Sequence, residues 1–459
     1  MPSATKYVAP SDPTRNDFVA PGRSEREERA TKYNAVRAYY DGDQKKHLRK
    51  KENEPDDNVV VNLIKLTVDR TVSHLFSQLP HFELDPDVSE DTPDEIWIKR
   101  AWETNGGVLF LSSVAMNGSF SGHNYVRVMP PDGDHPNGRL VNLDPTQLIT
   151  FWKADDIDTV VWYEQQWSDG SNVHIIDFVN QGEYWDIIEY MNAGGSWKTI
   201  ETVRWNNPLG PIVDWKHLPN PNRYYGSGEV NSLSVQDTVN LLYSEMARIV
   251  RYHASPKTVA IGVDSGDIKP TAIDEMWTIA ETGASVINLE MQSELQASQA
   301  LVQELQEHYL ALNRVVLLRG EVKDFQRVTN TGVRTVFLDM TAKNNLLVAS
   351  YKDALRKISI RLSLVAQGRP IDPTVRFADP LPTDRKEVID SLAIERSMKI
   401  VSRETASTKA GYHWPTELKK QEQEEKNPIF DIAAQMAKSD PNLTGKKPDQ
   451  GLTSKKSDV

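Results

Sequence analysis

Apolar residues recur at alternating spacings of three and four along two long runs of the chain, which together span residues 291–367. This spacing places them on one stripe of a helix, and such a stripe needs a partner surface. The stripe of the first run consists of Leu295, Ser298, Val302, Leu305, Tyr309, Leu312 and Val316. The stripe of the second run consists of Val333, Val336, Phe337, Met340, Leu347, Tyr351, Leu355, Ile358, Leu362 and Val365. We therefore expect two long helices here.

The second run ends at Gly368-Arg369-Pro370, a combination that stops helices. Residues 319–332 join the two runs and show no sustained apolar period. We therefore expect an exposed loop between two rigid helices, and loops in such positions commonly carry function.

Shorter helices are expected upstream, over residues 25–40, 61–79, 95–116 and 230–253, because each carries an apolar face at helical spacing. Pro80 ends the second of these helices. Asn117-Gly118 and Ser121-Gly122 break the third.

The chain between residues 125 and 213 instead shows short β-like runs separated by turn residues, which predicts an antiparallel meander. The expected strands cover residues 125–129, 140–143, 159–166, 173–179, 184–190 and 197–205. Seven of the eleven tryptophans lie between Trp152 and Trp215. They either pack inside the sheet and against a neighbour or form a carbohydrate-binding face.

Residues 255–290 predict a small mixed unit, with strands at 258–263 and 284–289 around a short helix at 273–279. Because long helices flank it on both sides, we expect it to form a knob at their far end. Helical runs follow at 385–400 and 402–410, and a glutamate-rich helix at 415–426 offers a solvated face or, alternatively, a metal site. Both chain ends are polar and are expected to be flexible.

Composition narrows the function classes. The chain has 459 residues, of which 39% are hydrophobic and 26% charged, with no cysteine and a net charge of −12. No apolar run is long enough for a membrane span, so we expect a soluble protein that is not secreted. The acidic balance argues against a surface that clamps phosphates but is compatible with DNA passing nearby. A short basic cluster is either a solvated face or a contact for nucleic acid or a partner; it consists of Lys45, Lys46, Arg49, Lys50 and Lys51.

The common signatures of hydrolases, metal sites and nucleotide sites are missing, so we expect no enzyme and no cofactor. Gly226 and Gly228 suggest a phosphate loop only weakly, because Asn231 replaces the third glycine of the dinucleotide fingerprint. Three aspartates, Asp155, Asp156 and Asp158, form either an exposed turn or a metal-binding cluster. In the second case the protein would be a magnesium-dependent DNA-processing enzyme.

Four stretches, in this order and spacing, resemble the portal proteins of tailed bacteriophages, and the siphophage-type portals most closely. The first is Tyr39-Tyr40-Asp41-Gly42, followed by Val61-Asn62 and a helix ending at Leu79-Pro80. The others are Tyr225-Gly226-Ser227-Gly228-Glu229 with Leu233, Gln236-Asp237 and Asn240; then Asn330-Thr331-Gly332 before a long helix; and finally Phe377-Ala378-Asp379-Pro380-Leu381-Pro382 with Asp384.

The resemblance implies an α+β, mainly helical portal fold in which subunits, typically twelve, form a ring at one capsid vertex. Its expected parts are an N-terminal arm (1–24), a wing (25–228) with the tryptophan-rich region, stem helices (229–254 and 291–318), a clip (255–290), a tunnel loop (319–332), a long wing helix and return (333–384), a crown (385–426) and a tail (427–459). The alternative from the residues alone is a carbohydrate-binding or adhesin-like protein.

The resemblance also implies the functional residues and partners. The tunnel loop would present Arg319, Glu321, Lys323, Asp324, Arg327 and Asn330 to double-stranded DNA in the channel. The clip would dock the large terminase subunit and later the head-tail adaptor, through a set comprising Asp264, Asp267, Lys269 and Trp277. The major capsid protein and the scaffolding protein would be further partners, in the virion and, during assembly, in the host cytoplasm.

Overall fold

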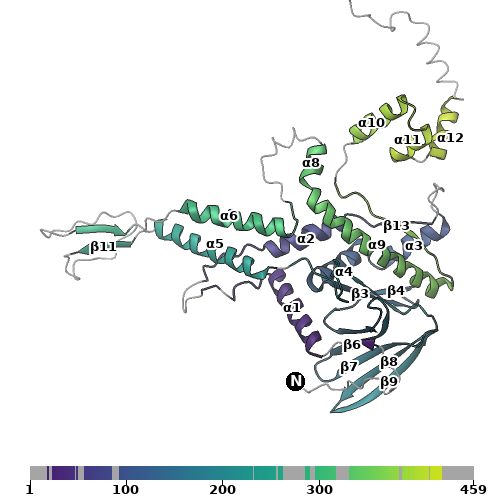
Figure 1. The fold of residues 1–459 in the computed structure, drawn as a ribbon, viewed down its shortest axis with the longest axis horizontal. Coiled ribbons are helices and arrows are strands. Elements are labelled where there is room, and N and C mark those ends of the chain that lie inside the picture. The colour runs from purple at the N-terminus through teal and green to yellow at the C-terminus, as the bar shows by residue number, and fades with distance from the viewer. Residues whose placement is uncertain are drawn as a thin grey trace, which may run out of the picture. The chain divides into compact units, whose positions relative to one another are not determined.

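The computed structural model shows a mixed fold of helices and sheets (Figure 1). It describes residues 18–19, 23–46, 48–49, 56–84, 92–230, 232–254, 257–261, 285–289, 295–316, 330–381, 385–412 and 414–425. The chain forms two compact units, one of Met1–Leu84 with Thr92–Leu381 and one of Asp85–Asp91 with Pro382–Val459. Within the described residues, no helix is both long enough and apolar enough to span a bilayer.

The first unit begins with the helices α1 (Arg23–Asp41) and α2 (Leu63–Leu75), both expected from their apolar faces. The prediction that α2 continues to Pro80 is wrong, because the helix ends at Leu75 with its C-cap at Phe76. Residues 95–116 were expected to form one helix, and this prediction is wrong. Two helices occur, α3 (Pro93–Thr104) and α4 (Gly107–Ser121). They separate because Gly106 and Gly107 have φ angles of 93° and 50°, a left-handed conformation that glycine adopts without strain. Helix α4 also runs through Asn117-Gly118 and ends only at Gly122.

A six-stranded antiparallel sheet has the strand order β1-β5-β6-β7-β8-β9. Its strands are β1 (Phe18–Val19), β5 (Leu148–Lys153), β6 (Val160–Ser168), β7 (Val173–Asn180), β8 (Trp185–Ala193) and β9 (Ser196–Trp205). A second sheet has the order β10-β3-β4 and consists of β10 (Ile212–Lys216), β3 (His123–Met129) and β4 (Arg139–Asn142). The expected meander is present, but β1, β5 and β10 are additional strands that the sequence pattern did not indicate. Strand β1 lies within residues 1–24, which were expected to form a flexible arm, and it is ordered by pairing with β5.

Most of the tryptophans of this region are packed inside. Trp162, Trp185, Trp205 and Trp215 are all buried. The indole nitrogens of Trp185 and Trp205 donate hydrogen bonds to the carbonyl oxygens of Pro208 and Leu209, at 3.0 and 2.8 Å. These four side chains therefore belong to the interior rather than to a glycan-binding surface.

Helices α5 (Leu233–Ala254) and α6 (Leu295–Leu312) lie side by side (Figure 1). In the chain, the paired strands β11 (Lys257–Ile261) and β12 (Ser285–Leu289) come between them, as expected. The helix expected at 273–279 falls outside the described residues. Between α6 and the next helix, residues 317–329 also fall outside them.

The second long run forms two helices instead of the expected one, α8 (Asn330–Val336) and α9 (Leu338–Gln367). Phe337 interrupts them and is buried against Met340 and Leu381. Val336 belongs to the expected stripe but is 52% exposed, whereas Val333 packs against the cluster of Phe337, so Val336 alone leaves the stripe before the interruption. Helix α9 ends at Gly368, whose φ of 71° caps it as the sequence predicted.

Helix α9 lies at the centre of the first unit's core. Its buried face packs in one cluster with side chains of α2, α4, β3 and β10. A short pair, β2 (His81–Glu83) with β13 (Thr374–Arg376), completes this unit. The second unit contains α10 (Arg385–Ser397), α11 (Arg403–Lys409) and α12 (Trp414–Glu425), three helices close to the expected positions.

Candidate functional site: a buried polar junction around the long helices

A buried ion pair joins α9 to the segment that enters α5. The Lys343 ammonium lies 2.6 Å from a carboxylate oxygen of Glu229, and both side chains are almost completely inaccessible to solvent. The same ammonium donates hydrogen bonds to the Thr71 hydroxyl on α2 at 3.0 Å and to the Asn313 carbonyl oxygen just after α6 at 2.8 Å. The Lys343 side chain therefore connects α9 to α2, to the segment that precedes α5 and to the residue that follows α6.

The other carboxylate oxygen of Glu229 continues this network into the sheets. It lies 3.2 Å from Nε2 of His217, whose Nδ1 lies 2.8 Å from the Tyr351 hydroxyl on α9. Asn124 of β3 donates to the same hydroxyl at 3.1 Å. We call Lys343, Glu229, His217 and Tyr351 the junction.

Electrostatics favour the charged form of Glu229. Burial alone would raise the pKa of this carboxyl, but the hydrogen bond from His217 and the charge of Lys343 outweigh burial, so the net pKa shift is downward. A buried pair of this kind costs desolvation energy and is kept only where its geometry and extra hydrogen bonds are good. The junction therefore fixes how its segments meet more than it adds stability.

Helix α5 attaches to the rest of the unit through a second polar surface, a stripe of Gln236, Asn240 and Ser244, all fully buried. Gln236 accepts from the backbone N–H of Leu63 and donates to the carbonyl of Val61, at 2.9 and 2.7 Å. Asn240 accepts from the N–H of Val61 at 2.9 Å, and Ser244 accepts from the N–H of Val59 at 3.0 Å. The stripe thus satisfies backbone groups of every second residue, Val59, Val61 and Leu63, in the segment that leads into α2.

Further along α5, charged side chains continue this attachment. Arg248 forms an ion pair with Asp57 at 3.0 Å, and Arg251 reaches the same carboxylate at 3.3 Å. In the expected basic cluster, Lys45 lies 2.6 Å from Asp56, and this hydrogen bond lowers the pKa of Asp56 to about 2.

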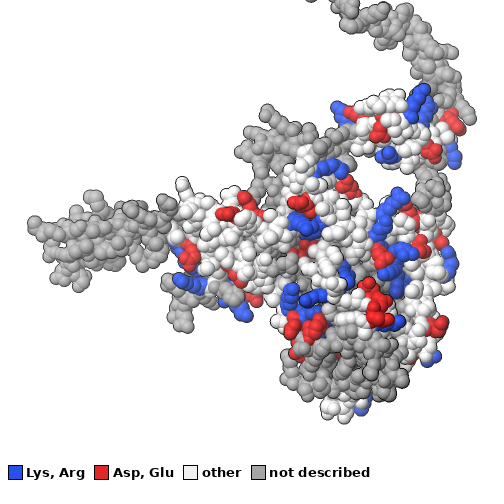
Figure 2. Space-filling model, in the orientation of Figure 1, with Lys and Arg blue, Asp and Glu red and all other residues white. Residues whose placement is uncertain are grey.

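The structure describes only two of the four remaining residues of the basic cluster. Lys46 and Arg49 are exposed, whereas Lys50 and Lys51 lie outside the described residues. Figure 2 shows positive and negative side chains interspersed over the described part of the surface that it presents to the viewer.

The glycines before α5 serve close packing. A Cβ on Gly226 would lie 2.4 Å from the carbonyl oxygen of Gly122, and a Cβ on Gly228 would lie 2.6 Å from that of Ser119. The N–H of Glu229 donates to the same Ser119 carbonyl at 2.9 Å. This loop is therefore pressed against the end of α4, which positions Glu229 and accounts for the glycines without a phosphate.

A carboxylate links the two sheets. Asp214 of β10 accepts from the Tyr163 hydroxyl of β6 at 2.5 Å and also from the hydroxyl of Tyr224. Its second oxygen lies 2.9 Å from Nε2 of His123. Burial lowers the pKa of His123, although Asp214 acts in the opposite direction. These contacts hold the sheets together next to the loop that leads to the junction.

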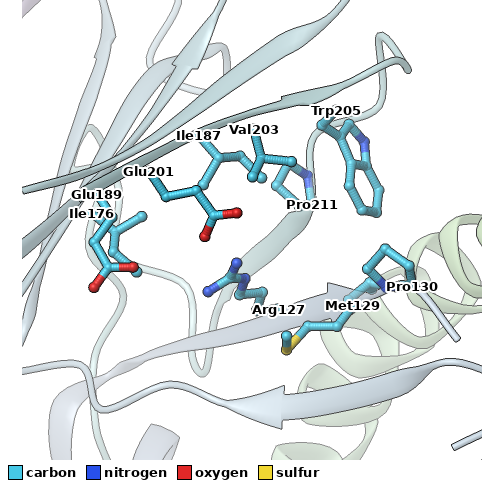
Figure 3. Close-up of a pocket in the computed structure, with 11 residues that line it drawn as sticks. Arg127, Met129, Pro130, Ile176, Ile187, Glu189, Glu201, Val203, Trp205 and Pro211 are labelled. Carbon is cyan, nitrogen blue, oxygen red and sulfur yellow. The ribbon is translucent and has the colours of Figure 1, made fainter. Parts of the chain in front are cut away.

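A small cavity of about 130 Å³ opens between the sheets on another side (Figure 3). Ile187 and Val203 form part of its apolar wall. Arg127 of β3 points into it, with Glu189 of β8 and Glu201 of β9 on the opposite wall. Burial lowers the pKa of Arg127, and the charge of Glu189 offsets this only in part.

The site residues implied by the resemblance stay predictions. Of the loop set, Arg319, Glu321, Lys323, Asp324 and Arg327 lie outside the described residues, and Asn330 is the first residue of α8. The clip set lies wholly outside them; it consists of Asp264, Asp267, Lys269 and Trp277.

The aspartate cluster lies in the turn between β5 and β6. Asp155, Asp156 and Asp158 are all exposed there. Among the residues that the structure describes, no group of three or more His, Cys, Asp or Glu is arranged to hold a metal ion.

Sequence reasoning missed the junction and the polar stripe of α5. His217 and Lys343 were not singled out, and Glu229 was noted only as part of the portal-like stretch. Gln236 and Asn240 belong to another such stretch, but a polar stripe by itself predicts a solvent-facing surface. The available signal was Lys343 itself, a charged residue at helical spacing from the apolar Met340 and Leu347.

Comparison with known proteins gives a family match over most of the chain. The model of the family described as "Phage portal protein, SPP1 Gp6-like" matches residues 23–427. No curated protein matches the chain.

Solved structures give remote likenesses. A chain of "Virion of native gene transfer agent (GTA) particle" is 13% identical with a TM-score of 0.40, covering 82% of this chain and 99% of that one. Chains of "Neck of native GTA particle computed with C12 symmetry" and "Neck of empty GTA particle computed with C6 symmetry" are each 12% identical, with TM-scores of 0.38 and 0.42. They cover 75% and 80% of this chain, and 99% and 96% of their own.

Proposed function

Since the chain belongs to the SPP1 Gp6-like family of phage portal proteins, we propose that it forms a closed ring at one capsid vertex and that double-stranded DNA enters and leaves the head through the ring. The family match over residues 23–427 carries this proposal. In a cyclic ring each interface joins two different surfaces of neighbouring copies, and the rotation must close. Twelve copies is the number that we propose.

Within this ring, α5 and α6 form the stem, and the segment between them, with β11 and β12, forms the clip that docks the terminase motor and later the head-tail adaptor. Residues 319–329 form the loop that lines the bore, because the last three residues of the expected loop, Asn330-Thr331-Gly332, belong to α8. The junction supports this arrangement, because Lys343 contacts the entry to α5, the end of α6 and α2 at once. It holds the stem at a fixed angle to the sheets of the wing.

The protein acts as a conduit, and the force for packaging comes from a separate ATP-driven motor. Twelve loops check the duplex by steric contact and through weak phosphate contacts. The net charge of −12 supports this proposal, because a conduit must let a polyanion slide without binding it tightly.

Deletion of residues 321–330 tests the role of the loop. We expect the variant to form rings of unchanged mass, since α6 and α9 make their contacts outside this segment. Heads assembled with it should hold less DNA protected from nuclease than heads with the unaltered protein. Rings and DNA content that both stay unchanged would contradict the role of the loop.

The carbohydrate-binding alternative loses its main support, because four of the seven clustered tryptophans are buried. If added glycans quenched the tryptophan emission of the protein, the carbohydrate-binding alternative would again be supported.

A further inference from the structure

Within the described residues, the last strand of the six-stranded sheet has one unpaired edge. Strand β9 pairs with β8 on one side, and the sheet order ends there. It is ten residues long, contains no proline, and is exposed along most of its length. An edge of this kind offers unpaired backbone groups to another strand, and natural proteins normally cover or break it.

Side chains on this edge also favour a partner. Ile200 and Val203 are 52% and 44% exposed, although β-branched side chains gain from cross-strand contacts. Glu201 lies directly opposite Glu189 in the β8–β9 register, and like charges in this position repel. Glu189 lies 3.7 Å from His174, whereas no ion pair with Glu201 occurs within the described part of the chain.

Arg127 does not fully neutralise the negative charge of Glu189 and Glu201. Its guanidinium points toward both glutamates across the small cavity (Figure 3), but one positive charge faces two carboxylates. A strand that placed a lysine beside Glu201 would therefore improve the electrostatics of the edge.

The opposite edge of the same sheet is covered by the chain's own N-terminal segment, since β1 pairs with β5. Residues 1–17 precede β1 and lie outside the described residues. Within them, Ala4-Thr5-Lys6-Tyr7-Val8-Ala9 lies between Pro2 and Pro10, is rich in strand-forming residues and carries one lysine.

Chain length argues for a neighbouring copy as the donor of this segment. Residues 10–17 link it to β1 and span at most about 26–29 Å when fully extended. A strand added outside β9 lies six strand spacings from β1 of the same sheet, which is about 28–29 Å. The copy's own edge is thus reached only by a taut linker that contains Pro10 and Pro13. A head-to-tail ring instead brings different surfaces of neighbouring copies together.

We propose that residues 4–9 of one copy add as a strand to the free edge of β9 in the next copy, with Lys6 beside Glu201. The inference rests on the proposed ring. Each sheet then carries an N-terminal segment of its own chain at one edge and one from its neighbour at the other. The N-terminal arms link the subunits around the ring.

Disulfide cross-linking tests this proposal directly, because the chain has no cysteine of its own. Tyr7→Cys is combined in turn with Ile200→Cys and with Thr202→Cys, which oppose position 7 in an antiparallel and a parallel pairing. The matched control combines Tyr7→Cys with Ser171→Cys in the exposed turn between β6 and β7. We expect one of the two β9 pairs to give a ladder of covalent oligomers on non-reducing gels, and the control to give none.

A charge exchange tests the contact between Lys6 and Glu201. Lys6→Glu or Glu201→Lys should each lower the ladder yield about two- to five-fold, and their combination should restore it. Closed rings without a ladder, or a cross-link only within single chains, would overturn the inference and leave the ring intact. Absence of rings in the cysteine-free protein would instead overturn the proposed function.

Discussion

At the scale of single residues, Lys343 decides how the long helices attach. Breaking a buried ion pair by removing one partner leaves an uncompensated charge and costs about 3–5 kcal/mol. Lys343→Met should therefore lower the free energy of unfolding by about this amount, measured by urea denaturation with tryptophan fluorescence. Adding Glu229→Gln removes the orphaned charge and should recover part of the loss.

Lys352→Met is the matched control, because Lys352 lies on the same helix but is exposed. Its free energy of unfolding should change by less than about 0.5 kcal/mol. Equal effects of Lys343→Met and Lys352→Met would show that the junction does not hold the unit together.

Glu164 gives the protein a pH dependence. The side chain is 5% exposed, and burial raises its pKa from 4.5 to about 7, while Arg26 acts in the opposite direction. Because the folded state holds this proton more tightly, the stability from this group is present below pH 4.5 and is lost as the pH rises through about 7. Glu164→Gln should therefore remove a loss on the order of 2–3 kcal/mol between pH 5 and pH 9, read from unfolding midpoints. If the unfolding midpoints of Glu164→Gln depended on pH as those of the unaltered protein do, Glu164 would not be the source of this pH dependence.

The residues of the apolar stripes were predictable from spacing alone, and those of the junction were not. Leu347, Tyr351, Leu355, Ile358 and Leu362 are buried as their spacing predicts. A lysine, a glutamate and a histidine far apart in the sequence carry no shared period. Only the fold brings them within hydrogen-bonding distance.

At the scale of elements, positions of helices and strands followed from the sequence, but their interruptions did not. The single helix expected over residues 95–116 divides at Gly106, and the long helix after residue 330 divides at Phe337. At Phe337 the apolar period continues across the break, whereas at Gly106 it does not, since Leu109 is 82% exposed and the buried face resumes at Leu111. Local backbone conformation and packing therefore override a periodic pattern.

The contact between Gly226 and Gly122 controls how the loop before α5 meets α4. Gly226→Ala would force a Cβ to within 2.4 Å of the Gly122 carbonyl, and backbone must move to admit it. We expect a loss of about 3 kcal/mol in the free energy of unfolding. Gly133→Ala is the control, since a Cβ there meets no atom within 4 Å. Equal stability of the two variants would show that the loop is not held by this contact.

At the scale of the whole molecule, the sequence resemblance predicted a portal protein, and the family match over residues 23–427 confirms it. Ring closure and copy number could not follow from sequence periodicity. They depend on the angle between surfaces of two copies, which one chain does not contain. The loop and clip residues likewise stay predictions.

The mass and symmetry of the assembled protein test the central claim most directly. Native mass spectrometry and negative-stain images of the purified protein, and of the protein released from heads, should show a closed ring with a central hole, built from about twelve copies of the 51.9 kDa chain. An open filament, or a monomer in both preparations, would contradict the account.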